Sequence, residues 1–334
     1  MRLYIENIGM IKEADVNLNG LTVIAGENDT GKSTVLKTLF AVIKGDNISN
    51  AMNTDERRAK EILAIRFNLV FDTYVSESGK IVLRDSQDND IMNIKIENEN
   101  FVKKFDRDSK NKQRLFDATF IPSPLIFDFI DFFNSVSRMR ERQKFDFGLD
   151  FNIKYPYIMW DLYDKLISSN IYPRVKKQKD INSIIEEIIN GKFVVEKNKN
   201  VFYYKNINGK IKSISMFNTA MGIKSFGIMQ LLNENRYLHP KYILLLDEPE
   251  VHLHPKWQIE YAKLIVELVK RGVKVLITSH SPFFIETIEN LYKDTNFYLA
   301  KDGMIKECRT DEIYDVLAQS IDILEEMEIE KLKW

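Results

Sequence analysis

The sequence predicts an α/β fold built on a mixed β-sheet, and three observations point to it. Over the last hundred residues, short apolar runs alternate with helix-period stretches, the pattern of a parallel sheet with covering helices. The first 18 residues show apolar–polar alternation, as in an antiparallel strand pair, and a short apolar strand follows at 21–25. A glycine-bracketed loop then leads into an amphipathic helix over 32–43.

Length and composition exclude several classes of protein. The 334 residues are enough for about two structural units, or for one large domain with insertions. With 48 Lys+Arg against 49 Asp+Glu, no overall field draws the chain to nucleic acid or anionic lipid. The single cysteine, Cys308, excludes an internal disulfide framework and a cysteine-based zinc site. No signal peptide or membrane-spanning run is recognisable, so we expect a cytoplasmic protein without a membrane partner.

The chain is expected to build its sheet from both ends. Helices are predicted near 223–233, 256–269 and 282–291, strands near 242–246, 273–278 and 296–300, and a closing helix over 312–333. The middle has a candidate helix around 62–65, alternating patches at 67–75, 80–83 and 91–96, a strand at 118–121, and a meander over 192–217 with an Asn208-Gly209 turn. The expected division is a discontinuous head (1–45 and 192–334), an antiparallel β-rich part (67–121) and a helical insertion lobe (122–191).

A phosphate-binding loop is predicted between the third strand and the first helix. The segment matches G-x-x-x-x-G-K-[ST], in which glycines let successive N–H groups point inward at the positive end of a helix. Lys32 would reach the β- and γ-phosphates, Ser33 would ligate Mg²⁺, and Thr34 would contact the α-phosphate. ATP with Mg²⁺ is the expected ligand, and the loop consists of Gly26, Glu27, Asn28, Asp29, Thr30, Gly31, Lys32, Ser33 and Thr34.

Two adjacent carboxylates end the apolar strand at 242–246. Ligands of open α/β sheets gather at the carboxyl ends of strands, so Asp247 and Glu248 should meet the glycine-rich loop. Asp247 suits the Mg²⁺ site, and Glu248 suits the base that polarises an attacking water. An acidic turn before Pro249 is the alternative.

A histidine follows the next strand. His280 would lie beside the phosphates and contact the γ-phosphate or the attacking water, and we count it with Glu248 and Lys32 as catalytic. Its alternative role is to cap the helix that begins at Pro282. His252 and His254 have the spacing of a metal pair, but a turn before the next helix is the favoured interpretation.

These motifs, in this order, resemble those of ABC-type ATPases of the soluble branch that includes SMC, RecF and OLD (overcoming lysogenisation defect) proteins. The style is that of OLD-like ATPases of bacterial anti-phage defence, and the similarity covers about the first 45 and last 120 residues. It rests on the loop at 26–34, Leu246-Asp247-Glu248-Pro249-Glu250, Leu253-His254-Pro255 and Thr278-Ser279-His280-Ser281-Pro282. The resemblance implies an ATP-driven switch that forms a homodimer or higher homo-oligomer with nucleotide between two heads.

The resemblance also implies a signature loop that acts in trans before the Asp247 strand. Residues 218–227 occupy that place, with Thr219 and Gly222 as contacts, although Ala220 stands where a serine is usual. Gln113 is a guess for the Q-loop glutamine. The Toprim nuclease domain of OLD proteins does not fit in the forty residues after the strand at 296, so we expect a separate effector protein, a nuclease or a toxin.

Three alternatives stay open. A DNA repair ATPase of RecF or SMC type shares the motifs, whereas a transporter subunit should have a clear Leu-Ser-Gly-Gly-Gln signature and fewer than the 220 residues that separate Gly26 from Asp247. A small-molecule kinase would not explain the acidic pair and the histidine. Basic clusters leave DNA open as a partner but are commonly solvated faces; they lie at 57–58, 103–104, 138–144 and 174–179.

Overall fold

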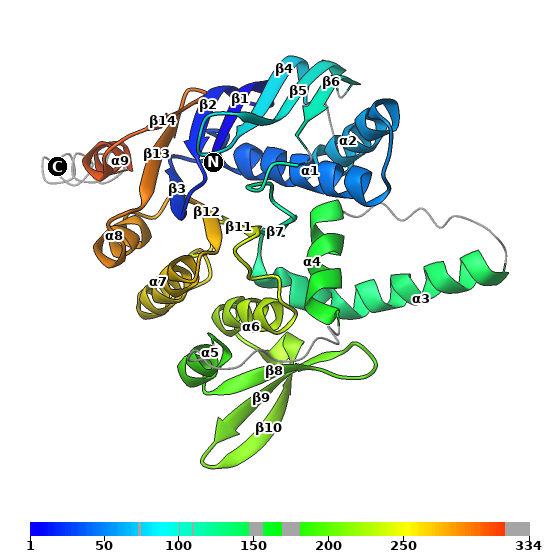
Figure 1. Cartoon of the computed structure of the whole chain (residues 1–334). Coiled ribbons are helices and arrows are strands. Elements are labelled where there is room, and N and C mark those ends of the chain that lie inside the picture. The colour runs from blue at the N-terminus through cyan, green and yellow to red at the C-terminus, as the bar shows by residue number, and fades with distance from the viewer. Residues whose placement is uncertain (73–74, 100, 109, 147–155, 169–180, 318–334) are drawn as a thin grey trace, which may run out of the picture.

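The computed structural model describes residues 1–72, 75–99, 101–108, 110–146, 156–168 and 181–317. A large sheet of eleven strands forms its centre, and Figure 1 shows how the helices surround it. The strand order is β6-β5-β4-β1-β2-β14-β13-β3-β12-β11-β7. The strands are β1 (Arg2–Ile8), β2 (Ile11–Asn17), β3 (Leu21–Ala25), β4 (Ser76–Arg84), β5 (Asp90–Glu99), β6 (Phe101–Arg107), β7 (Asp117–Ile121), β11 (Tyr242–Asp247), β12 (Lys274–Ser279), β13 (Asn296–Lys301) and β14 (Met304–Glu307).

One half of the sheet is parallel and buried on both faces. β7, β11, β12, β3 and β13 pair in parallel in that order. Alternate side chains of β11 enter two different cores: Leu244 and Leu246 face one, and Ile243 and Leu245 face the other. This two-sided burial explains the uninterrupted apolar run in the sequence.

The other half is antiparallel and continues the same sheet. β1 pairs with β2 and β4, and β4 continues to β5 and β6. β14, a strand that the sequence did not reveal, joins the halves by pairing antiparallel with β13 and parallel with β2. The β-rich part predicted over 67–121 therefore differs from the structure at its C-terminal end, because β7 pairs in parallel with β11 and belongs to the other half.

Helices cover both faces of the sheet. α1 (Lys32–Ala51) and α2 (Glu56–Phe71) lie on one face; the other carries α6 (Met221–Glu234), α7 (Pro255–Lys270) and α8 (Pro282–Leu291). α9 (Thr310–Leu317) packs on α8, and the rest of the predicted closing helix lies outside the described residues. Among the described residues, every helix is too short or too polar to span a bilayer.

Two predicted boundaries were wrong in the region of α1 and α2. The patch at 67–75 is not a strand at its start, because α2 continues to Phe71, with Phe67 and Val70 on its buried face. Asp55 begins that helix by accepting a hydrogen bond from the Arg58 N–H, and Asp72 ends it with a left-handed φ of 54°. α1 extends eight residues beyond the expected end at position 43, since its polar second half is buried and paired.

The middle of the chain forms a separate group of helices and a small sheet (Figure 1). Its sheet has the order β10-β9-β8, and the Asn208-Gly209 turn has the two positive φ angles, 50° and 76°, that a tight hairpin requires. The elements are the 3₁₀ helices η1 (Pro124–Phe129) and η2 (Met216–Asn218), α3 (Ile130–Asp146), α4 (Tyr157–Ile167), α5 (Ile181–Ile189), β8 (Gly191–Val195), β9 (Val201–Ile207) and β10 (Lys210–Ser215).

A buried ring of four charges ties α1 to β7 and α4. Lys44 Nζ lies 2.5 Å from Asp117 Oδ1 and 2.6 Å from Asp161 Oδ1, and Lys165 Nζ lies 3.1 and 2.9 Å from the second oxygens of the same carboxylates. Burial alone would lower the pKa of Lys44, but the carboxylates of Asp161 and Asp117 outweigh it and raise that pKa. The ring therefore holds two ammonium and two carboxylate groups in balance.

Asp46, two residues after Lys44, makes a second buried contact. Its carboxylate lies 2.6 Å from Arg114 Nε and 3.5 Å from Arg107 Nη1, at the end of β6. Neighbouring residues of α1 thus hold two different parts of the molecule in place.

Candidate nucleotide-binding site

The loop between β3 and α1 has a backbone that needs its two glycines. Gly26 has φ of 150°, and a Cβ there would lie 2.5 Å from the carbonyl oxygen of Ala300. Gly31 is left-handed, with φ of 91°, and forms the N-cap of α1 without a side-chain cap. The helix therefore begins at Lys32 with its first N–H groups directed at the loop, which is the arrangement that binds phosphate.

Lys32 lies inside this loop. Its Nζ donates to the carbonyl oxygens of Gly26 at 2.8 Å and Glu27 at 2.5 Å, and only 4% of the side chain is exposed. Burial lowers the pKa of Lys32, and the carboxylates of Glu248 and Asp247 oppose that shift. The ammonium thus donates to two carbonyl oxygens of its own loop, and its ion pair with Glu248 Oε1 is long, at 3.9 Å.

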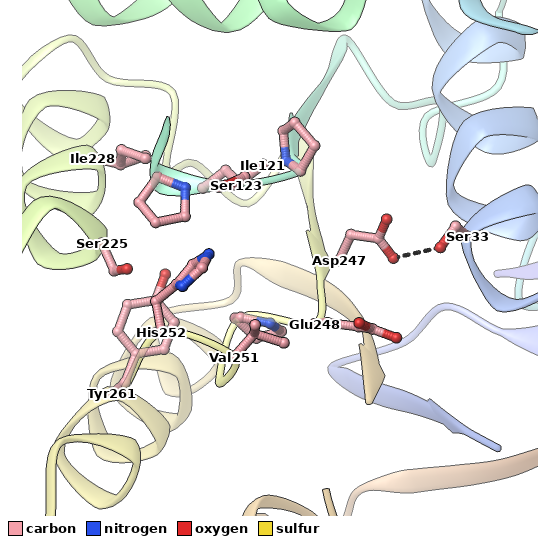
Figure 2. A pocket seen from close by; sticks show the side chains of 13 residues that line it. Ser33, Ile121, Ser123, Ser225, Ile228, Asp247, Glu248, Val251, His252 and Tyr261 are labelled. Carbon is pink, nitrogen blue, oxygen red and sulfur yellow. Dashed lines mark hydrogen bonds between the residues drawn. The ribbon is translucent and has the colours of Figure 1, made fainter. Parts of the chain in front are cut away.

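Ser33 and Asp247 meet across 213 intervening residues (Figure 2). Ser33 Oγ donates to Asp247 Oδ1 at 2.8 Å, and Thr278 Oγ1 donates to the same oxygen at 2.6 Å. A hydroxyl and a carboxylate are the hard oxygen ligands that Mg²⁺ takes from a protein when phosphates and waters complete its shell. These residues therefore fit the ion that the sequence predicted, and within the described ranges no cluster of three or more histidine, cysteine or acidic side chains offers another metal site.

Glu248 lies between Lys32 and His280 at the carboxyl ends of β11 and β12. Its Oε1 is 3.0 Å from His280 Nδ1, and its backbone adopts a left-handed φ of 46°. The Glu248 N–H donates to both the carbonyl and the hydroxyl oxygen of Thr278, each at 3.1 Å, which fixes this uncommon conformation. The structure thus brings together the three side chains expected from sequence to be catalytic.

Glu250 is a carboxylate at this rim to which sequence reasoning assigned no role. It is 2% exposed, and its Oε1 accepts a 2.5 Å hydrogen bond from Ser279 Oγ, which in turn accepts from the Ser281 N–H at 3.1 Å. Burial raises the pKa of Glu250. The only sequence signal was a third acidic residue after a strand, and such a pattern does not reveal that the side chain turns inward.

A cavity of about 210 Å³ adjoins Ser33 and Asp247 (Figure 2). It separates the ends of β7 and β11 from α6 and α7, so the nucleotide rim opens toward the helical part of the molecule. His252 points into it, whereas His254 Nδ1 caps α7 by accepting from the Lys256 N–H at 3.3 Å. The lining residues are Ser33, Ile121, Pro122, Ser123, Pro124, Ser225, Ile228, Asp247, Glu248, Pro249, Val251, His252 and Tyr261.

Comparison with known proteins identifies the family. Residues 21–286 match the family model described as "AAA domain, putative AbiEii toxin, Type IV TA system". The chain belongs to this AAA domain family. The match begins at β3 and ends within α8, so it includes every residue of the rim described above.

The chain is also similar to a curated protein and to solved structures. The chain is 25% identical over 325 residues to the Septu protein PtuA of Bacillus thuringiensis, covering 85% of this chain and 72% of that protein. An SMC head bound to the C-terminal winged-helix domain of ScpA superposes with a TM-score of 0.51 at 12% identity, covering 92% of this chain and 96% of that one. The SMC head domain from Thermotoga maritima gives a TM-score of 0.45 at 13% identity, with 92% and 97% covered.

The fold prediction is confirmed: this AAA domain protein has the P-loop α/β fold of an ABC-like ATPase head. The OLD-like branch stays a prediction.

The candidate signature loop precedes α6 as expected, but Thr219 is poorly suited to donate its hydroxyl. That side chain is 6% exposed, and its Oγ1 already donates to the Ser215 carbonyl at 2.9 Å. Ala220 is the N-cap and provides no side-chain cap, so the first N–H groups of α6 are what the loop offers. Gly222 has a packing role, since a Cβ there would lie 3.1 Å from the Trp257 ring.

Gln113 is not at the rim, and the guess that it is the Q-loop residue was wrong. Its side chain exchanges two hydrogen bonds with Ser86, in the turn between β4 and β5. Gln113 precedes β7, so it lies near the amino end of that strand. Ile121, which lines the cavity, lies at the carboxyl end of the same strand.

Some of the basic clusters noted in the sequence are paired with carboxylates, and others lie wholly or partly outside the described residues. Arg57 and Arg58 pair with Glu61, and Lys103 pairs with Glu97, so these are solvated faces. Lys104 likewise pairs with Asp106. The side chains from 140 to 144, and all of 174–179, lie outside the described residues.

Proposed function

We propose that this protein is an ATP-binding and ATP-hydrolysing switch of anti-phage defence. The observation that carries the proposal is one rim at which the loop lysine, the Ser33–Asp247 pair and the Glu248–His280 pair meet, although the chain brings them from segments more than 200 residues apart. The family match and the similarity to an ABC-like head support ATP as the nucleotide.

The residues divide the chemistry between them. The loop N–H groups and Lys32 bind the β- and γ-phosphates, and the ammonium exchanges the Gly26 and Glu27 carbonyls for phosphate oxygens. Ser33 and Asp247 would hold Mg²⁺, which supplies charge neutralisation to the phosphates when bound. Glu248 accepts a proton from the attacking water, and His280, whose Nδ1 lies 3.0 Å from that carboxylate, contacts the γ-phosphate or the same water.

Hydrolysis is proposed to control assembly with an effector. The N–H groups at the start of α6 would contact the γ-phosphate bound to a second copy, so that ATP joins two heads and its hydrolysis separates them. The similarity to Septu protein PtuA supports a role in defence, and the family description, with its putative toxin, supports a toxic outcome. The separate effector, a nuclease or a toxin, is part of this proposal. A repair role of RecF or SMC type is the second candidate from sequence.

Glu248→Gln tests the proposal. The amide keeps the size of the side chain but cannot take a proton, so phosphate release should fall by about 10²–10⁴-fold while ATP binding persists. The variant should accumulate an ATP-dependent dimer, measured by light scattering after size-exclusion chromatography. Glu56→Gln, on an exposed face of α2, is the control.

Two results would count against the proposal. Phosphate release at the parental rate would remove Glu248 from catalysis. A Glu248→Gln protein that stays monomeric at saturating ATP would remove the dimer from the mechanism.

A further inference from the structure

The small sheet β8–β10 carries a local positive charge that the rest of the chain does not share. Residues 191–215 contain six lysines and one glutamate, a net charge of +5, whereas the whole chain has a net charge of −1. No carboxylate in the described part of the chain lies within ion-pair distance of any of these lysines, unlike those of α2 and β6. They are Lys192, Lys197, Lys199, Lys205, Lys210 and Lys212.

The pairing of the strands places two of these lysines opposite each other. Lys212 of β10 is the direct cross-strand partner of Lys205 of β9, and Lys210 follows on the same face two residues away. Like charges directly opposite in a sheet destabilise it, and no acidic side chain among the residues that the structure describes forms an ion pair with either lysine. This pair lies on the face of Tyr203, so it adds to the positive charge of the small sheet from that side.

The two faces of the small sheet differ in what they contact. Phe193, Val201 and Tyr203 point to one face, where they are buried in the core that includes α5 and α6. Gln230 of α6 fixes β8 there through two hydrogen bonds with the backbone of Phe193. The opposite face is turned away from that core (Figure 1).

The opposite face presents two aromatic rings on the central strand. Phe202 and Tyr204 of β9 are two residues apart and only partly buried, and their cross-strand neighbours on β10 are Ser215 and Ser213. Serine is too small to cover an adjacent ring. On the β8 side, Tyr204 is paired with the exposed Lys192, and its hydroxyl donates to Glu196 Oε1 at 3.0 Å, which holds the ring in place.

We propose that this face binds single-stranded nucleic acid, with bases stacked on Phe202 and Tyr204, and with phosphates held by Lys192 and attracted by the charge of the nearby lysines. Successive bases stack on aromatic side chains of an open sheet, and each stacked base contributes about 1–3 kcal/mol. Lys192 shares the face of the rings, and the lysines of the other face and of the β8–β9 turn add attraction within a Debye length of about 8–10 Å.

The combination of rings and lysines favours this occupant over two others. Lysines alone are a common protection of exposed edge strands, but edge protection gives no role to two aromatic residues on the central strand. A duplex would contact the lysines through its backbone while its paired bases stay out of reach of the rings. The inference goes beyond the proposed ATPase and does not depend on it.

Binding of a fluorescent 20-nucleotide oligothymidine to the full chain, followed by anisotropy at 50 to 200 mM salt, tests the proposal. Phe202→Thr with Tyr204→Thr keeps β-branched side chains in the strand, removes both rings and should weaken binding about 5- to 100-fold. Tyr204→Phe keeps the ring and should bind within about threefold of the parent.

The charge contribution is measured from the salt dependence. Lys192→Gln, on the face of the rings, combined with Lys197→Gln and Lys199→Gln, in the adjoining β8–β9 turn, should lower the slope of log affinity against log salt by about 1–2. The matched control replaces Lys60, Lys103 and Lys263, each paired with a carboxylate elsewhere, and should leave the slope unchanged. Far-UV circular dichroism and parental ATP turnover show that each variant is folded.

Several outcomes would overturn the proposal. They are no binding of oligothymidine by the parent, unchanged affinity after both rings are removed, tighter binding of a 20-base-pair duplex than of the single strand, and ring-dependent binding to vesicles of phosphatidylserine and phosphatidylcholine in place of the oligonucleotide. Lys32→Ala should bind the oligonucleotide like the parent, so a failure of the ATPase proposal is distinguishable from a failure of this one.

Discussion

Two buried lysines of α1, Lys32 and Lys44, have opposite kinds of partners. At the N-terminal end, Lys32 has two carbonyl partners from its own loop and a carboxylate at 3.9 Å. About twelve residues later, Lys44 lies between two carboxylates at 2.5 and 2.6 Å, inside a closed ring. Both lysines are almost completely buried, so burial alone does not separate them.

The difference lies in the partners. A buried ammonium that is already paired with carboxylates has no unpaired donor for a ligand. Removing one group of such a set leaves another charge buried without a partner. A buried ammonium held mainly by neutral carbonyls gains when a phosphate arrives. On this basis we expect Lys32 to act in a binding site, whereas Lys44 belongs to the framework that holds α1 against β7 and α4.

The largest expected effect is on nucleotide binding at the N-terminal end. Lys32→Ala removes the ammonium that would contact the phosphates, so affinity for a fluorescent ATP analogue should fall by more than about 100-fold, or about 3 kcal/mol. The unfolding midpoint should change little. Lys37→Ala, on the same helix, is the control, and undiminished affinity of Lys32→Ala would remove Lys32 from the site.

The opposite result is expected at the charge ring around Lys44. Asp161→Ala leaves the two ring lysines with one carboxylate, so the free energy of unfolding in urea should fall by about 3–5 kcal/mol, with nucleotide affinity retained. Glu61→Ala, which breaks an exposed pair on α2, should change stability little. A stability loss in Asp161→Ala no larger than that of the control would show that the ring does not hold the fold together.

A smaller effect is expected at Glu250, which lies at the same rim as Lys32 and is buried, like the lysines of the charge ring around Lys44. Because its pKa is raised in the folded state, the folded protein holds a proton that the unfolded chain releases above about pH 4.5. Its contribution to stability is therefore complete below that pH and is lost as pH rises through the folded pKa. Glu250→Gln cannot titrate, so its stability relative to the parent should increase between pH 5 and pH 8, measured by urea denaturation. Parallel stability curves for the two proteins would contradict this assignment.

Sequence patterns predicted the rim because its parts are local. The loop at 26–34 and the pair Asp247–Glu248 each follow an apolar strand, and strand direction alone places them at one edge. The fold class followed from the alternation of strands and helices. Glu250 was missed because its burial depends on Ser279, a residue from another strand.

The charge ring, β14 and the full extent of α2 could not be predicted from the sequence, because they depend on contacts or signals outside the local pattern. The four ring residues come from α1, β7 and α4, and no local pattern marks a lysine as paired. β14 has four residues with a single buried side chain, Ile305, so its alternation is too short to detect. In α2, the few apolar residues around Phe67 and Val70 fit the spacing of a helix as well as that of a strand. Asp55, which caps the helix, lies too far before them in the sequence to decide between the two.

The position of Lys165 has a consequence for how the molecule behaves in solution. β7 is an outer strand of the large sheet, and the Lys165 ammonium donates to the Ala118 carbonyl at 2.6 Å and to Thr119 Oγ1 at 3.0 Å. Outer strands with free main-chain groups can recruit strands from other molecules. Because Lys165 occupies one such carbonyl, we expect it to disfavour the addition of a strand from another molecule at this position of β7.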